Sequence, residues 1–97
     1  MTAYRPDWPA PANVGARTTT RDGGASAAPW ASLNLGDHVG DDPASVATNR
    51  ARVAAQLPAE PVWLSQIHSA AVVELDHNRP AAPPAADASV TRVPGVV

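Results

Sequence analysis

The 97-residue chain has no cysteine, no phenylalanine and no lysine. Without cysteine it forms neither a disulfide scaffold nor an all-cysteine metal site. No apolar run approaches the ~20 residues that a membrane helix needs, and Met1 is not followed by the basic segment and apolar core of a signal peptide. We therefore expect a cytoplasmic protein that makes no contact with a membrane.

Charge is scarce as well, at 16% of residues and a net charge of -2. The seven basic residues are all arginine and are spread along the chain. A nucleic-acid-binding surface requires clustered basic residues, so we expect no nucleic-acid partner.

Most of the apolar residues are small. Hydrophobic residues make up 44% of the chain, but 21 residues are alanine, and there are 11 prolines. A chain of this length buries roughly 60–65% of its unfolded surface, and here it does so with small side chains. The composition predicts at most one domain, with a marginal core.

The first half of the chain predicts extended and loop structure. Three prolines in residues 1–12 exclude a helix and predict an extended lead-in anchored by Trp8. The β-prone residues 14–20 predict a strand, and residues 27–42 predict a long loop. The apolar residues expected to hold this loop in place are Trp30, Leu33 and Leu35.

The clearest local signal is a helix that begins at Pro43. Asp41 or Asp42 is a suitable N-cap, and proline is favoured at the first helical position. Apolar residues then recur at three- and four-residue spacing as far as Leu57, and Pro58 ends the pattern. Arg50 falls on the apolar side, which indicates an internal salt bridge.

Three strands are predicted after the helix. Residues 62–68 alternate in polarity, which places Gln66 and His68 on one face of a strand that ends at His68. Residues 72–75 and 85–92 predict two further strands. The β-branched residues after the Pro-Gly turn at 94–95 resemble the beginning of another strand, so we expect the chain to be incomplete at this point.

Histidine is the first candidate for chemistry. An imidazole acts as a base, an acid or a metal ligand, and the strand end predicted at His68 would carry it into a cleft. A hydrogen-bonded, half-buried structural histidine is the alternative. His38 and His77 lie at no spacing typical of a metal pair, so the chain alone does not predict a complete metal site.

Three further polar features leave alternatives open. The segment from Arg21 through Gly23 and Gly24 combines a cation with exposed backbone N–H groups, and it is either an anion site or a simple turn. Asn34, between two leucines, is either a loop staple or a ligand-orienting amide. Asp87 is a carboxylate supporting a metal ligand, a base or a turn-former.

Taken in order, five groups of residues resemble the YfiH family, also called the laccase-domain or multicopper polyphenol oxidase family. They are Thr19 to Ser26 (TTRDGGAS), Ser32 to Asp41 (SLNLGDHVGD), Val46 with Asn49 and Arg50, Val62 to His68 (VWLSQIH), and Ala86 to Thr91 (ADASVT) with Pro94 and Gly95. The resemblance extends from about Trp8 to the end of the chain.

The resemblance implies an α/β fold in which a mixed β-sheet is layered with helices, similar to a cysteine-hydrolase-like scaffold. Residues 1–97 would be the N-terminal part of one such domain. It also implies that His68 is a catalytic zinc ligand, completed in the family by a cysteine and a histidine from segments that this chain lacks. We expect Arg21, Gly23 and Gly24 to bind phosphate and Asn34 to hold the base or ribose.

The activity implied by the resemblance is zinc-dependent phosphorolysis of adenosine, inosine or methylthioadenosine, with adenosine deamination as a companion activity. Editing of peptidoglycan precursors has also been attached to the family. Phenol oxidation with copper ranks lower, because it requires many paired histidines. We expect the full-length parent to be the enzyme and this chain alone to be inactive; the alternative is a short non-catalytic module that binds a ligand or partner.

Overall fold

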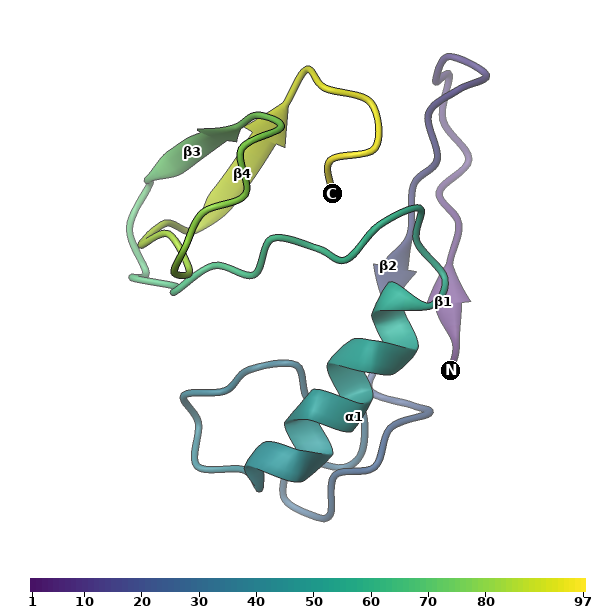
Figure 1. Ribbon diagram of the computed structural model, residues 1–97. Helices are drawn as coiled ribbons and strands as arrows, with labels where there is room; N and C mark the ends of the chain where they lie inside the picture. The colour runs from purple at the N-terminus through teal and green to yellow at the C-terminus, as the bar shows by residue number, and fades with distance from the viewer. The chain divides into compact units, whose positions relative to one another are not determined.

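A computed structural model describes residues 1–97, which divide into two compact units, Met1–Val53 and Ala54–Val97. Figure 1 labels the elements of both units along the chain. No helix in the structure has the length and apolar character needed to cross a membrane.

The first unit opens with a short antiparallel pair of strands. Strand β1 (Ala3–Tyr4) pairs with β2 (Thr18–Thr19), so that Ala3 lies opposite Thr19. The predicted strand over 14–20 therefore forms only in its threonine-rich part, where β-branched side chains favour extended backbone. The prediction that Trp8 anchors the lead-in is wrong, because its side chain is 54% exposed.

Helix α1 (Pro43–Ala54) begins at the predicted residue. Asp42 is its N-cap: its Oδ2 accepts hydrogen bonds from the backbone N–H and the hydroxyl of Ser45, at 3.3 and 3.0 Å. The helix ends before the predicted Leu57, whose N–H instead closes a turn on the carbonyl of Ala54 at 3.0 Å. The approaching Pro58 prevents a further helical turn.

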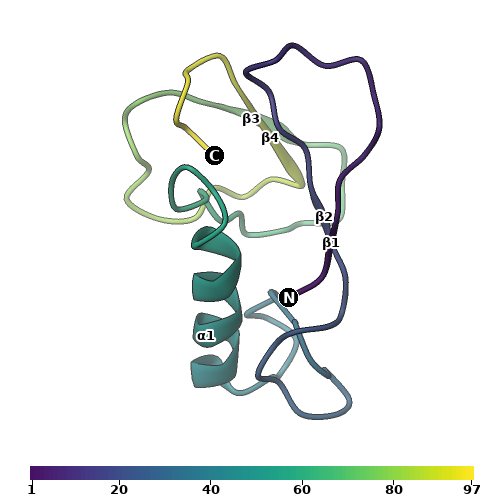
Figure 2. The same cartoon turned by 90° about the vertical axis from the view of Figure 1, so that its right-hand side faces the viewer.

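The core of this unit lies between α1 and the long loop that precedes it. Val46 and Val53 on the helix are buried together with Leu33 of the loop. Figure 2 shows residues 21–42 beside the N-terminal half of α1. Leu33 thus holds the loop as predicted, while Trp30 and Leu35 are half-buried.

A fully buried amide, that of Asn49, links the helix to this loop. Its Oδ1 accepts the N–H of Ala25 at 2.7 Å. Its Nδ2 donates to the hydroxyl of Ser26 at 2.9 Å and to the carbonyls of Ser32 and Asn34 at 3.1 and 2.8 Å. One side chain therefore satisfies polar groups from three parts of a loop that has no ladder of its own.

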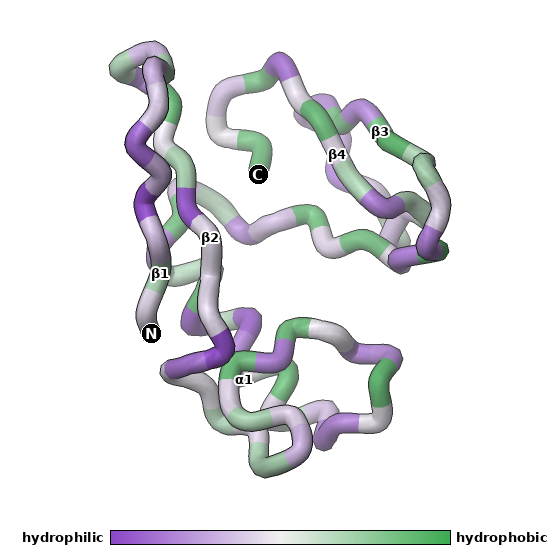
Figure 3. Tube along the Cα trace, turned by 180° about the vertical axis from the view of Figure 1, so that it is seen from behind, coloured by the Kyte–Doolittle hydropathy of each residue, from purple (hydrophilic) through white to green (hydrophobic).

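The second unit contains a parallel pair of strands. Strand β3 (Val72–Leu75) pairs with β4 (Ala88–Thr91), Val72 opposite Ala88 and Leu75 opposite Thr91. Both strands form within the predicted ranges, and they carry the apolar residues seen in green in Figure 3. Leu75 and Ala86 are the buried residues of this unit.

The predicted strand over residues 62–68 does not form. Only Ser65 makes an isolated bridge, to Ala85. His68 has a φ of 55°, which is left-handed backbone that a strand does not contain. The prediction that Gln66 and His68 share a strand face is therefore wrong, because the chain turns at residues 67–69 before a ladder can develop.

The role of the Asn49 amide is testable by truncation. We expect Asn49→Ala to lower the free energy of unfolding by about 2–4 kcal/mol, because the N–H and C=O groups that it serves lose their partner inside the protein. Urea denaturation measures the change, with Thr48→Ala on the exposed face of α1 as the control. Equal midpoints for the two variants would contradict this account.

Candidate functional site

The residues singled out from the sequence fall into the two units. Arg21, Gly23, Gly24 and Asn34 belong to the first unit, and His68 belongs to the second.

The loop at Arg21 is closed against residues 31–33. The carbonyl of Arg21 accepts the N–H groups of Ser32 and Leu33 at 2.9 and 2.8 Å, and its Nε donates to the carbonyl of Ala31 at 2.9 Å. The base of the guanidinium is thereby fixed while the side chain stays exposed. The guanidinium is therefore exposed to solvent, while its Nε end is held in place by the backbone.

The two glycines of this loop are required for different reasons. Gly23 has a φ of 90°, which side chains disfavour. At Gly24 an added Cβ would lie 2.0 Å from the carbonyl oxygen of Ser32, so no side chain fits. The N–H of Gly24 donates to the hydroxyl of Ser32 at 3.0 Å, so this N–H is engaged within the protein rather than directed at an anion.

Asn34 is a staple of the following loop. Its Nδ2 donates to the carbonyl of Gly36 at 3.1 Å and to Oδ2 of Asp41 at 3.0 Å, and its Oδ1 accepts the N–H of Gly36 at 3.1 Å. Both amide hydrogens are thus used inside the unit, which is the loop-staple alternative offered by the sequence.

The carboxylate of Asp41 ends this network. Its Oδ2 also accepts the hydroxyl of Ser26 at 2.5 Å. The hydrogen bonds from Ser26 and Asn34, with a smaller one from the backbone of Asp42, lower the pKa of Asp41 in spite of partial desolvation, which raises it. The ionised form is therefore the one that the fold stabilises.

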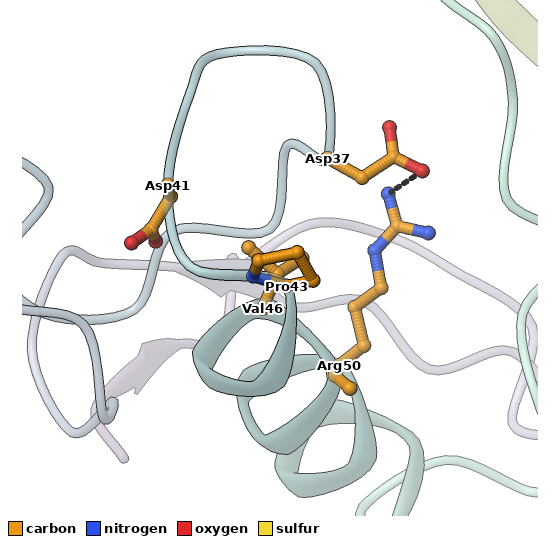
Figure 4. A pocket seen from close by; sticks show the side chains of 6 residues that line it. Asp37, Asp41, Pro43, Val46 and Arg50 are labelled. Atoms are coloured by element: carbon orange, nitrogen blue, oxygen red, sulfur yellow. Dashed lines mark ion pairs between the residues drawn. The ribbon is translucent and has the colours of Figure 1, made fainter.

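A pocket of about 220 Å³ lies at the start of α1. Figure 4 shows Arg50 extending from the helix toward Asp37, with Nη2 3.7 Å from Oδ2; its Nε donates to the carbonyl of Leu35 at 2.8 Å. The salt bridge predicted for Arg50 forms, but it lies at the surface, because the side chain of Asp37 is 62% exposed. The pocket is smaller than the 300–1,000 Å³ of common ligand sites, and it is lined by none of the candidate site residues Arg21, Gly23, Gly24, Asn34 and His68.

The lowered pKa of Asp41 predicts a dependence of stability on pH. The ionised carboxylate contributes its full stabilisation above the pKa of the unfolded chain, about 3.9, and this is lost as pH falls through the lower pKa of the folded state. We expect Asp41→Asn to reduce stability at pH 7 and to differ progressively less from the unsubstituted chain below about pH 4.

Urea midpoints measured from pH 7 to pH 3 check this expectation. The matched control is Asp22→Asn, at an exposed carboxylate of the same unit. A constant difference between Asp41→Asn and the unsubstituted chain across that range would argue against it.

In the second unit His68 stands at the apex of a turn held by Asp87. Oδ1 of Asp87 accepts the N–H of Ile67 at 3.2 Å, and Oδ2 accepts the N–H and hydroxyl of Ser69 at 2.9 and 3.0 Å. His68 is exposed and adopts left-handed backbone, the one non-glycine residue in the chain that does so. It is neither inside the unit nor half-buried, which excludes the buried structural alternative.

The carboxylate of Asp87 is held ionised by these contacts. Desolvation raises its pKa, but hydrogen bonds from the backbone and hydroxyl of Ser69 and from the backbone of His68 and Ile67 outweigh it, so the pKa lies below its ordinary value. The local sequence around Asp87 is compatible with several roles, because no local pattern connects this residue with residues 67–69.

The donor set of this chain does not fit a complete metal site. No group of three or more His, Asp or Glu side chains is arranged to hold an ion, and His68 is the one metal-ligand candidate singled out from the sequence. A catalytic zinc site in a protein needs three such donors. Within this chain, His68 therefore offers a single imidazole.

The backbone of His68 gives a test based on stability alone. Left-handed backbone costs a non-glycine residue roughly 1–2 kcal/mol, whereas the greater freedom of glycine in the unfolded chain costs about 0.4–1 kcal/mol. We expect His68→Gly to leave the free energy of unfolding unchanged or to raise it by up to about 1 kcal/mol.

The matched control is His77→Gly, at an exposed histidine whose φ is not positive. It is expected to lower the free energy of unfolding by about 0.4–1 kcal/mol. Chemical denaturation of both variants measures the two changes, and an equal loss in both would show that His68 carries no backbone strain.

The fold of the chain matches that of a solved structure. The chain superimposes on a crystal structure of a Neisseria meningitidis protein with a TM-score of 0.85 and 47% sequence identity, over 97% of this chain and 38% of that one. The chain thus has the α/β fold expected from the sequence.

The family follows from the sequence match. The family described as multi-copper polyphenol oxidoreductase laccase matches residues 15–97. The chain belongs to this laccase-like family, the YfiH family, and the resemblance read from its motifs is confirmed.

Curated relatives of high identity carry a different kind of name. A protein of Pseudomonas aeruginosa named purine nucleoside phosphorylase is 54% identical over 94% of this chain. Proteins of Haemophilus influenzae and Escherichia coli with the same name, the latter called YfiH, are 46% and 48% identical over 100% and 95% of it. The chain spans 36–40% of the length of these relatives.

Proposed function

We propose that this chain is the N-terminal part of a purine nucleoside phosphorylase that acts on adenosine, inosine or methylthioadenosine. The observation that carries the proposal is the identity of 46–54%, over nearly the whole chain, to relatives with that name. The share of those relatives that the chain spans supports an incomplete catalytic domain.

The proposed reaction exchanges one bond for another. An oxygen of inorganic phosphate forms a bond to the anomeric carbon of the ribose, the bond from that carbon to the purine nitrogen breaks, and the base leaves with a proton. The products are a free purine and a pentose 1-phosphate. A protein promotes this exchange by holding the phosphate dianion against the sugar and by stabilising the charge that moves to the base.

Arg21 is the residue of this chain that we assign to phosphate. Its guanidinium is exposed, and its Nε is fixed on the carbonyl of Ala31 at 2.9 Å. A guanidinium binds phosphate through paired N–H groups. Gly23 and Gly24 let the loop turn sharply and pack on Ser32, so in this proposal they shape the phosphate site.

Asn34 and His68 have separate roles. Because the amide hydrogens of Asn34 are used by Gly36 and Asp41, we assign Asn34 to holding the substrate loop in shape. His68 would contribute one ligand to a zinc ion, with copper as the alternative metal, whose other ligands lie outside this chain. The roles proposed for this chain involve its own side chains alone.

Adenosine deamination remains a companion activity of the proposal, since it acts on the same nucleoside. Phenol oxidation draws support from the family description, but the relatives from Pseudomonas aeruginosa, Haemophilus influenzae and Escherichia coli are all named purine nucleoside phosphorylase. The identity to nucleoside phosphorylases therefore favours nucleoside chemistry.

A chimera tests the proposal. This chain would replace the matching residues of the Pseudomonas aeruginosa relative, and phosphate-dependent release of hypoxanthine from inosine would be measured. We expect turnover in the chimera. Arg21→Ala should raise the KM for phosphate at least tenfold, which corresponds to about 1.4 kcal/mol, because the phosphate loses its cation.

The matched control is Arg92→Ala, an exposed arginine that pairs with Glu74 at 3.2 Å and should leave the KM for phosphate unchanged. A chimera that unfolds cooperatively but releases no base would refute the proposed function. An unchanged KM for phosphate in Arg21→Ala would remove Arg21 from it.

A further inference from the structure

The turn at residues 67–69 is clamped from both sides by the segment that leads into β4. The N–H of Ala86 donates to the carbonyl of Ser65 at 3.1 Å, and the N–H of Asp87 donates to the carbonyl of Ala71 at 2.9 Å. These bonds fix the backbone of Asp87 against the chain before and after the turn. Its carboxylate therefore reaches the turn from a fixed point.

The carboxylate itself serves the backbone of the turn. Its two oxygens accept the N–H of Ile67, and the N–H and hydroxyl of Ser69. With both oxygens engaged by residues on either side of His68, the carboxylate is occupied as an acceptor. This arrangement favours the turn-forming role of Asp87 over a role as a base.

The residue at the apex is unusual for its backbone. A φ of 55° suits glycine, and asparagine more readily than other residues. Histidine at this place is held in a conformation that costs free energy, and such residues gather at functional sites. The strain is offset by the hydrogen bonds to Asp87, and the outcome is an exposed imidazole whose backbone has a single defined orientation.

We propose that Asp87 is the positioning residue of His68: by accepting the N–H groups on both sides, it holds His68 in left-handed backbone and so sets the direction of the imidazole. The inference rests on the proposed function in one respect only, the role of the imidazole as a zinc ligand. Asp87 acts through the backbone of the turn and touches neither substrate nor metal.

The experiment has one readout in the 97-residue chain and one in the chimera. In the chain, the HN–Hα coupling and carbon chemical shifts of His68 report φ, and amide exchange reports the N–H groups of Ile67 and Ser69. In the chimera, kcat and KM for inosine and phosphate are measured. The variants are Asp87→Asn and Ser69→Ala, with Ser89→Ala at an exposed position of β4 as the control.

We expect Asp87→Asn to abolish the left-handed signature of His68 and to speed amide exchange at residues 67 and 69. An asparagine side chain has one acceptor oxygen and an NH2 group that only donates, so one of the two turn N–H groups would face a donor instead of an acceptor. In the chimera kcat should fall at least tenfold, with both KM values changed less than twofold. Ser69→Ala removes only the hydroxyl donor and should lower kcat two- to fivefold without unfolding the chain.

Two results would overturn the proposal. One is an unchanged φ at His68 in both variants, and the other is an unchanged kcat in a variant whose turn has lost its protected amides. An inactive unsubstituted chimera would refute the proposed function, but the readout at His68 in the chain would still decide whether Asp87 positions it.

Discussion

Backbone N–H and C=O groups that lie in loops need partners, and in this protein two side chains supply many of them. Asn49 joins helix α1 to three parts of the preceding loop through its buried amide. Asp87 does the same for the turn at residues 67–69 with its carboxylate. The short strand pairs could not perform this role, because each contains only two strands of two to four residues. The loop that precedes α1 and the turn at residues 67–69 both owe their shape to such side-chain acceptors and donors.

The need for hydrogen-bond partners in the loops explains how a chain rich in alanine and proline holds its polar side chains in defined positions. Few large apolar side chains are buried, and the core consists of Leu33, Val46, Val53, Leu75 and Ala86. Hydrophobic burial alone would leave the loops free to take many conformations. Polar networks have directional requirements, so a fully satisfied network selects one loop conformation. The chain leaves no buried side-chain N or O atom without a partner.

Both side chains proposed for function lie on loops that other residues hold in place. The chain belongs to the laccase-like YfiH family, and its relatives carry the name purine nucleoside phosphorylase. The exposed guanidinium of Arg21 and the exposed imidazole of His68 both stand on loops whose backbone is fixed by other residues. Binding and catalytic residues are often found on loops positioned in this way. The two loops are built by separate hydrogen-bond networks, one in each unit.

The sequence by itself determined the start of α1, the strands β3 and β4, and the family, because a cap, a proline at the first helical position, β-branched residues and ordered motifs are local signals. The staple at Asn34 was one of two readings that local residues allowed. Only the tertiary structure decided that residues 62–68 turn instead of forming a strand. That turn depends on Asp87, which lies 20 positions beyond Ile67, and a hydrogen bond between distant residues leaves no trace in local polarity or spacing.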